Sequence, residues 1–457
     1  MAPVAPPAPL VSWTLRWKAA KNEPAPKAEV CSLKYGKRWA YAVEIDDGPV
    51  STLTVSQPLL ANYTFTDAPP GIAGGKAMPF VGGAAVIALR AGTRNQTFLN
   101  WEQLRGLQKS GWGLLSHSYW HSGYGWEPKG ALTPAQFRDE LYWSQTIFAA
   151  ERGNGRAPIH LVLPNGYTDY APYLAAYGLR SASRVGGKPN HLGDSKNDFA
   201  DMDRNYLDES VWSKPGDPLA GFPATPATDD LIIDFTHGME ADPAAPNHTR
   251  WKARLDSIAG RFGSGGDDSM WCAPTGDVVA YTLAARGAKL ETGPGRVTLR
   301  VPNGLPGTTL TIHLSGVTTP ITAPPGATLY RRGPEVWITT PRIGLPGAPA
   351  PLPHLQCVYR GPVKTVTLAA PARIAGVRVL QQGEPKSGYM LGLTLVSPTG
   401  QSVPLSLPSP GTNWGAWLLY PIVPNLPPVL SKTVQINADP SLSEMEVWAV
   451  PETRTKR

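Results

Sequence analysis

The sequence has few of the features that mark several large protein classes. Its 457 residues include only three cysteines, Cys31, Cys272 and Cys357, which are scattered and form no CxxC pair. At most one disulfide can form, which excludes a small fold held together by a disulfide framework. No uninterrupted apolar stretch reaches the roughly 18 residues that indicate a membrane-spanning helix. The chain is therefore not expected to span a membrane.

The sequence also lacks a dense run of basic residues. Its net charge is +7, and the segment Glu291–Arg457 holds 14 Lys/Arg against 7 Asp/Glu, which accounts for the whole excess. No Lys/Arg run is interleaved with aromatic residues, so nucleic acid is not an expected partner. The excess is typical of ordinary solubilising charge, with a weak attraction to anionic glycan or cell wall as the alternative.

Proline and glycine are abundant instead, with 49 and 47 residues. Such a composition predicts many turns and short strands, and the length predicts about two or three domains. Residues 1–30 are rich in Pro, Ala and Lys and are expected to form a flexible N-terminal arm. They lack the charged start and apolar centre of a signal peptide.

Residues 31–290 alternate between strand and helix patterns. Two capping boxes, from Asn100 to Gln103 and from Thr133 to Gln136, mark helix starts. The alternation predicts an α/β fold with a parallel sheet or a (β/α) barrel, in which chemistry gathers at the carboxyl ends of the strands. Two long insertions, 51–94 and 190–230, are expected either as lids and substrate-binding walls or as plain surface loops. The expected strands are 39–45, 112–116, 159–163, 179–183 and 231–235.

After residue 290 the helical patterns stop, and short strands between Pro/Gly turns predict all-β sandwich domains. We expect a small β domain over 291–345 and a β-sandwich over 346–457. The text of Pro371–Leu380, Leu393–Gly400 and Ser443–Trp448 weakly resembles a galactose-binding-like jelly roll. Such modules often bind sugars, so Trp414 and Trp417 are candidates for stacking on a sugar ring. The alternative is an inert spacer whose tryptophans lie in its core.

The most informative local feature is the pair Asp46 and Asp47, which ends an apolar strand and runs into Gly48 and Pro49. Two adjacent carboxylates repel each other unless a positive charge lies nearby. A divalent metal ion is the usual source of that charge. An Asp-Asp-Gly sequence on its own is most often just a turn.

Histidines follow two of the other expected strands. His117 and His121 are four residues apart, which places both imidazoles on one face if the chain becomes helical after the strand. With one carboxylate they make an Asp/His/His set that leaves metal positions open for water or substrate. His237 leaves a buried strand directly into Gly238, where it is placed to face a pocket. The remaining histidines are expected to be structural or exposed: His160, His191, His248, His313 and His354.

Four motifs occur in a fixed order: the aspartate pair, the His-Ser-Tyr-Trp-His segment, a Pro-Asn-Gly turn after a strand, and then His237. In these motifs the sequence resembles the polysaccharide deacetylase family. These are the NodB-homology enzymes of carbohydrate esterase family 4, and the resemblance covers roughly residues 31–290. It implies a distorted (β/α) barrel and a metal-dependent hydrolase.

The resemblance also implies residue roles. Asp47, His117 and His121 would hold the metal, usually Zn²⁺, with Asp46 as general base and His237 as general acid. The turn at Asn165, Gly166 and Tyr167 would line the oxyanion and substrate pocket.

The sequence departs from this family in three places. The family's third motif begins with an arginine that orients the base aspartate, whereas the run here is Leu163-Pro-Asn-Gly166. Arg180 or Arg184 are the candidates to replace it. Asp208 and Trp212 are loose counterparts of the fourth motif, an aspartate with a nearby tryptophan. Glu44 replaces the small polar residue usual before the aspartates.

The resemblance therefore predicts a hydrolase that removes acetyl groups from an N- or O-acetylated glycan with a metal-activated water. The alternatives are a related metal-dependent C–N or ester hydrolase acting on a non-glycan substrate, and a non-catalytic carbohydrate-binding protein. A glycan substrate would favour an extracellular or periplasmic location.

Overall fold

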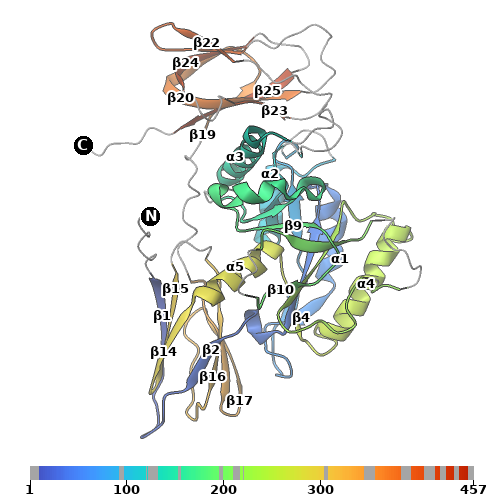
Figure 1. Ribbon diagram of the computed structural model, residues 1–457, viewed down its shortest axis with the longest axis vertical. Helices are drawn as coiled ribbons and strands as arrows, with labels where there is room; N and C mark the ends of the chain where they lie inside the picture. Colours follow the sequence, from blue (N-terminus) through green and yellow to red (C-terminus); the bar gives the residue numbers. More distant parts are fainter. Residues whose placement is uncertain are drawn as a thin grey trace.

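The computed structural model describes most of the chain (Figure 1). The described residues are 10–91, 97–119, 121, 132–152, 156–194, 199–208, 217–219, 221–302, 307–343, 356–381, 393–405, 417–421, 429–436 and 442–450.

Seven parallel strands close into a barrel, which confirms the predicted fold class. The order around the barrel is β3-β6-β7-β8-β9-β11-β12, and β12 pairs with β3 from Leu231↔Ala40 to Thr236↔Ile45 to close it. The barrel is distorted, because one edge of β3 pairs first with β13 and only at its last two residues with β6. The barrel strands are β3 (Trp39–Ile45), β6 (Gly83–Val86), β7 (Gly113–Ser116), β8 (His160–Val162), β9 (Ser181–Val185), β11 (Met202–Tyr206) and β12 (Asp230–Thr236), flanked by β10 (Asn190–His191) and β13 (Met270–Cys272).

Two barrel strands lie inside the segments that the sequence predicts as insertions. β6 falls within 51–94 and β11 within 190–230, so neither segment is wholly a lid or a surface loop. β6 consists of small residues because space is tight: a Cβ on Gly83 would lie 2.6 Å from the Leu115 side chain. β11 contains charged and polar residues and shows no apolar strand pattern. The other elements of these segments are η2 (Thr52–Ser56), α1 (Gln57–Ala61), β4 (Thr64–Thr66) and β5 (Ala77–Pro79) in the first and β10 in the second.

Helices pack on the outside of the barrel. Both predicted capping boxes are present: the Asn100 and Thr133 side chains accept from the backbone N–H groups of Gln103 and Gln136. Among the described residues, no helix is long and apolar enough to cross a membrane. The helices are α2 (Trp101–Lys109), α3 (Pro134–Glu151), α4 (Pro246–Phe262) and α5 (Thr275–Gly287), with short helical segments η1 (Lys34–Gly36), η3 (Pro164–Gly166) and η4 (Thr168–Tyr177).

The prediction of a flexible N-terminal arm is wrong from residue 10 onward. β1 (Leu10–Arg16) pairs along its length with β15 (Arg296–Pro302), and β2 (Lys27–Val30) pairs with β16 (Thr311–Ser315). The pairing buries Leu15, whose side chain is 3% exposed, among the apolar residues of the later strands. The chain start therefore completes the small β unit, whose other strands are β14 (Lys289–Gly293), β17 (Thr328–Arg332) and β18 (Glu335–Thr339). Residues 1–9 lie outside the described part.

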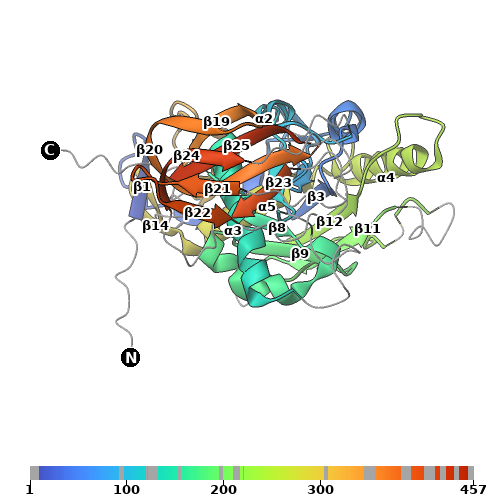
Figure 2. The same cartoon turned by 90° about the horizontal axis from the view of Figure 1, so that it is seen from above.

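The C-terminal β unit lies at the end of the molecule near α2 and α3 (Figures 1 and 2). Trp448 and Ala375 of this unit belong to the same apolar core as the barrel, so the two units share a packed interface. Trp414 lies outside the described residues, and of Trp417 only the backbone, at the start of β23, is described. The strands of the C-terminal β unit are β19 (Gln356–Pro362), β20 (Val366–Gln381), β21 (Leu393–Val396), β22 (Ser402–Leu405), β23 (Trp417–Pro421), β24 (Val429–Ile436) and β25 (Leu442–Val450).

Candidate metal centre and its polar surroundings

The aspartate pair lies where β3 leaves the barrel. The Asp46 N–H donates to the Thr236 carbonyl at 2.9 Å, which continues the β3–β12 pairing by one residue. Asp47 and Gly48 then turn the chain with φ of 68° and 70°. This left-handed pair separates the two carboxylates, because the chain changes direction between them. Asp46 is 2% exposed, whereas the Asp47 side chain is 26% exposed.

His117 follows β7 and is fixed by two backbone carbonyls. Its N–H donates to the Val86 carbonyl at 3.0 Å, and its ring Nδ1 lies 2.8 Å from the Val162 carbonyl at the end of β8. A carbonyl can only accept, so Nδ1 carries the proton and Nε2 keeps its lone pair. Nε2 lies 3.6 Å from Oδ1 of Asp47. A ring held in this tautomer is the form that ligates a metal.

His121 reaches the same place through a loop. The helical turn expected from the four-residue spacing is absent here, because Ser118 and His121 have left-handed φ values of 62° and 60°. The Ser118 hydroxyl accepts from the His121 N–H at 2.9 Å and stabilises this tight path. The backbone N–H groups of Ala88 and Leu89 donate to the carbonyls of residues 118 and 119. The two imidazole rings meet edge to face with their centres 4.5 Å apart.

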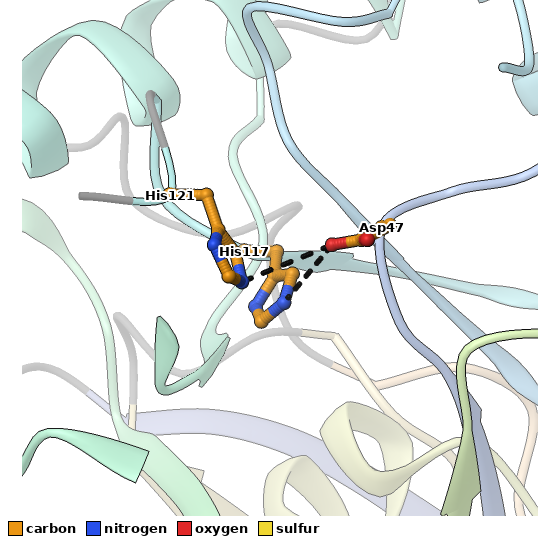
Figure 3. A group of neighbouring side chains, drawn as sticks. All are labelled: Asp47, His117 and His121. Carbon is orange, nitrogen blue, oxygen red and sulfur yellow. Dashed lines mark ion pairs between the residues drawn. The ribbon is translucent and has the colours of Figure 1, made fainter. Parts of the chain in front are cut away.

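The resulting three side chains fit a metal ion (Figure 3). One potential ligand atom from each of Asp47, His117 and His121 lies within 4.8 Å of the other two. Nε2 of His121 is 3.8 Å from Oδ1 of Asp47. Ligands at about 2.1 Å in a tetrahedral zinc site lie about 3.4 Å apart, so only small shifts are needed. Among the described residues, neither Nε2 of His117 nor Oδ1 of Asp47 has a hydrogen-bond partner, although both are buried.

The protonation states also suit a metal. Burial, and then repulsion from His117, lowers the pKa of His121 to about 3, so this imidazole is neutral at neutral pH. Burial by itself raises the pKa of Asp47, but His117, His121 and Arg90 together lower it below its ordinary value. Asp47 and His121 thus offer lone pairs to a metal ion without having to release protons.

Arg90 is a further neighbour that the sequence analysis missed. Its Nη1 lies 3.5 Å from Oδ2 of Asp47, the carboxylate oxygen that does not face the histidines. Its guanidinium also lies over the Phe98 ring, 4.9 Å from the centroid. No motif signals this residue, because it follows β6, a strand that the sequence does not predict.

Asp46 is held by an arginine from an unexpected strand. Nη1 of Arg204 in β11 donates to Asp46 at 2.8 Å and to Glu44 at 3.1 Å, and all three side chains are at most 3% exposed. Neither of the expected replacements occupies this position. Arg184 pairs with Asp201, and Arg180 lines a cavity at the opposite end of the barrel.

Glu44 extends the buried polar network into the barrel. Its carboxylate lies 3.2 Å from Nε2 of His160 and accepts from the Ser183 hydroxyl at 3.1 Å and from the Thr275 hydroxyl. Burial alone raises the pKa of Glu44, but the charge of His160 and of Arg204 lowers it to about 2. Glu44 is therefore a buried anion with several partners. His160 is fully buried.

His237 pairs with Asp208 just after β12. Its Nδ1 lies 2.6 Å from Oδ2 of Asp208, and the Thr236 hydroxyl donates to the same carboxylate. The hydrogen bond to Asp208, opposed by desolvation and aided by the charge of Asp46, raises the pKa of His237. The side chain is 48% exposed and so remains accessible to a ligand. Trp212, the other loose counterpart of the fourth motif, lies outside the described residues.

The turn after β8 lies beside His117, because His117 contacts the Val162 carbonyl. Asn165 has a left-handed φ of 53°, and Tyr167 is 45% exposed. The N–H groups of Gly166 and Tyr167 donate to the carbonyls of Leu163 and Pro164. These two amides are thus used within the turn.

Comparison with known proteins gives limited matches. No family model and no curated protein matches the sequence. Among solved structures, the Streptococcus pyogenes deacetylase PplD in complex with acetate matches at 16% identity and a TM-score of 0.27, over 36% of this chain and 62% of that one. A de-N-acetylase from Aggregatibacter actinomycetemcomitans matches at 20% identity and a TM-score of 0.25, over 36% of this chain and 68% of that one. This chain thus spans less than two thirds of the first structure. Both TM-scores are low.

Proposed function

We propose that this protein is a metal-dependent hydrolase that removes acetyl groups from an N- or O-acetylated glycan. One observation carries the proposal: Asp47, His117 and His121 converge beside a separately held Asp46, and among the described residues the facing atoms of Asp47 and His117 are buried without a hydrogen-bond partner. Zinc suits two imidazoles and one carboxylate with a position left open. The acetylated glycan as substrate rests on the sequence resemblance alone.

The residues divide the work of acyl transfer. A divalent cation bound by Asp47, His117 and His121 would supply water with a lowered pKa and would polarise the acyl carbonyl. Asp46 accepts the proton of the attacking water. The guanidinium of Arg204 orients the Asp46 carboxylate through a buried, charge-assisted hydrogen bond.

His237 supplies the proton for the leaving group. Asp208 fixes the proton on Nδ1, so Nε2 is the atom that donates to the departing amine or alcohol when the ring is protonated. The raised pKa of His237 favours that protonated form near neutrality. The products are acetate and a free amine or hydroxyl. The Asn165 turn would line the substrate pocket.

A paired measurement tests the proposal. Metal content is determined on the purified full chain, and acetate release is measured from chitooligosaccharides and from O-acetylated glycans, with and without added Zn²⁺. The proposal expects about one zinc per chain and zinc-dependent acetate release. Acetate or amine release only from non-glycan amides and esters would favour the related C–N or ester hydrolase.

Bound zinc with no turnover on any substrate would favour a carbohydrate-binding protein. Absence of zinc at Asp47, His117 and His121 would contradict both metal-dependent readings. A glycan substrate also suggests an extracellular or periplasmic location, which fractionation of the source cells would test.

A further inference from the structure

A cavity lies at the amino end of the barrel, opposite the metal centre. It has a volume of about 670 Å³ and is bordered by the starts of β7 and β8, the segment before β9, the first turn of α5 and the small β unit. The proposed mechanism uses no residue that lines it. Its volume is within the range of about 300–1,000 Å³ that is usual for small-molecule sites.

The cavity lining carries a large excess of positive charge. Among the residues that line it, Asp277 is the one carboxylate, against five cationic side chains. Four of the five are arginines. The cations come from four separate parts of the chain: Lys34, Arg152, Arg156, Arg180 and Arg342.

Four of these five cations lack a carboxylate partner in the described part of the chain. Lys34, Arg152, Arg180 and Arg342 have no carboxylate within ion-pair distance among the described residues. Asp277 is close enough to interact electrostatically with Lys34, Arg342 and Arg152. Among the described residues it forms no ion pair with any of the three. Burial, opposed by Asp277 and reinforced by Arg156 and Arg342, lowers the pKa of Arg152 to about 10. Like charges gathered in a cavity destabilise the empty state and favour an anion there.

We propose that this cavity binds a small anion that bears a phosphate or pyrophosphate group. Arginine presents a planar fork of donors that matches phosphate oxygens, and several converging forks select a multiply charged group over chloride. Trp112, Trp271 and Tyr177 also line the cavity and offer apolar walls to the remainder of such a molecule. The site is separate from the acetyl-transfer centre and does not depend on its chemistry.

Calorimetry and thermal unfolding of the full chain test this site. The probes are inorganic phosphate, pyrophosphate and a phosphate monoester such as glucose 6-phosphate, with sodium chloride matched for ionic strength. Pyrophosphate is expected to raise Tm and to bind more tightly than phosphate. Tighter binding of the monoester than of phosphate would identify a phosphorylated metabolite as the ligand, and the reverse would identify the free anion.

Variants locate the binding. Arg342→Gln and Arg180→Gln, both at exposed positions, are each expected to weaken pyrophosphate binding about tenfold or more, since each removes a charge-assisted hydrogen bond. Arg296→Gln, an equal charge change at an exposed position in β15, is the matched control and should bind normally. Absence of pyrophosphate binding in the wild type would overturn the inference, as would equal weakening in all three variants.

A different observation supports a second inference, about the C-terminal β unit. In the sequence, Tyr119 stands between His117 and His121. It is 1% exposed and hydrogen-bonds to Arg378 of β20. Arg378 is itself buried and contacts Glu446 of β25 at 2.7 Å and 2.8 Å. The Trp448 ring N–H donates to the same carboxylate at 2.9 Å.

The histidine loop is therefore fixed from both sides. On the barrel side, Glu140 of α3 accepts from the Tyr119 N–H at 3.0 Å, and on the other side Arg378 contacts the Tyr119 ring hydroxyl. We infer that Arg378 and Glu446 are positioning residues for the metal ligands, so the C-terminal unit is part of the functional centre. This inference rests on the proposed metal site.

Zinc affinity, measured by competition with a chelator, tests this role without any assay of turnover. Arg378→Met and the milder Tyr119→Phe are expected to weaken zinc binding about 10–100-fold, as is usual when a partner that orients a ligand is lost. Arg373→Gln, at an exposed position on the same strand, is the control. Unchanged zinc affinity in a folded Tyr119→Phe variant would overturn this inference alone. A wild-type chain that binds no zinc would overturn the proposed function and, with it, this inference.

Discussion

The two ends of the barrel use charge in opposite ways. At the carboxyl end, Asp46, Asp208 and His237 each have a hydrogen-bonded partner of opposite charge, and the atoms of Asp47 and His117 that lack a partner face each other. At the amino end, cations outnumber carboxylates by five to one in the cavity lining. Carboxyl ends of barrel strands usually carry the chemistry and amino ends the stability. Here the amino end also has the character of a binding site.

A buried polar path joins the two ends. Glu44 contacts Arg204, which holds Asp46 at the metal centre, and also His160, which lines the amino-end cavity. In a low-dielectric interior, removal of one side chain from such a network leaves its partners without hydrogen bonds, which lowers the stability of the fold. Variants at each end show whether the two ends are nevertheless separate in function.

The largest effect is expected at the metal ligands. Asp47→Asn removes the one anionic ligand and should lower zinc affinity and abolish detectable acetate release, because the histidine pair alone binds metal weakly. Metal analysis and acetate release measure both effects. Glu102→Gln, an equal charge change on exposed α2, should leave both unchanged. Retention of full zinc binding by Asp47→Asn would contradict the proposed ligand set.

Asp46→Asn separates proton transfer from metal binding. It should lower kcat by about 10²–10⁴-fold, the usual contribution of a general base, while zinc content stays at the wild-type level. Loss of zinc in this variant would mean that the roles of the two aspartates are misassigned.

Arg204→Met tests the buried ion pairs and should mainly lower stability. It leaves Glu44 and Asp46 buried without their cation, which is expected to cost about 3–5 kcal/mol in the free energy of unfolding. Urea unfolding measures this loss. Arg300→Gln, which breaks an exposed pair with Glu291, should cost only about 0–1 kcal/mol. A loss as small for Arg204→Met would show that the buried pair contributes little.

Asp208→Asn should change the pH dependence of the reaction. The hydrogen bond to Asp208 raises the pKa of His237, so its removal lowers that pKa. His237 then loses its proton at a lower pH, and the alkaline limb of the kcat profile should move toward acid. A pH–rate profile for wild type and variant measures the shift. An unmoved alkaline limb would argue against His237 as the general acid.

The smallest effect is expected from the amino end. Arg342→Gln should leave zinc affinity and kcat/KM within about twofold of the wild-type values, since distant sites with no shared partner act independently. The same assays as above measure both quantities. A larger change would show that the two ends are coupled through Glu44 and His160.

The strand ends that carry the site were predictable because their signals are local. An apolar run followed by Asp-Asp-Gly or by His-Gly indicates where a buried strand emerges, and β3 and β12 lie where predicted. Small or polar barrel strands give no such signal. β6 packs through glycine and alanine, and β11 buries an arginine that is acceptable only beside Glu44 and Asp46. Both strands, with Arg90 and Arg204, were therefore missed.

The sequence by itself determined the fold class, the candidate ligands and the order of the site residues, because each depends on a few neighbours along the chain. Tertiary structure decided which arginine holds Asp46, how a loop rather than a helix brings His121 beside His117, and that the first strands complete the small β unit. It also gathered the five cations of the amino-end cavity. These features join residues up to about three hundred positions apart, and local pattern carries no information about such pairings.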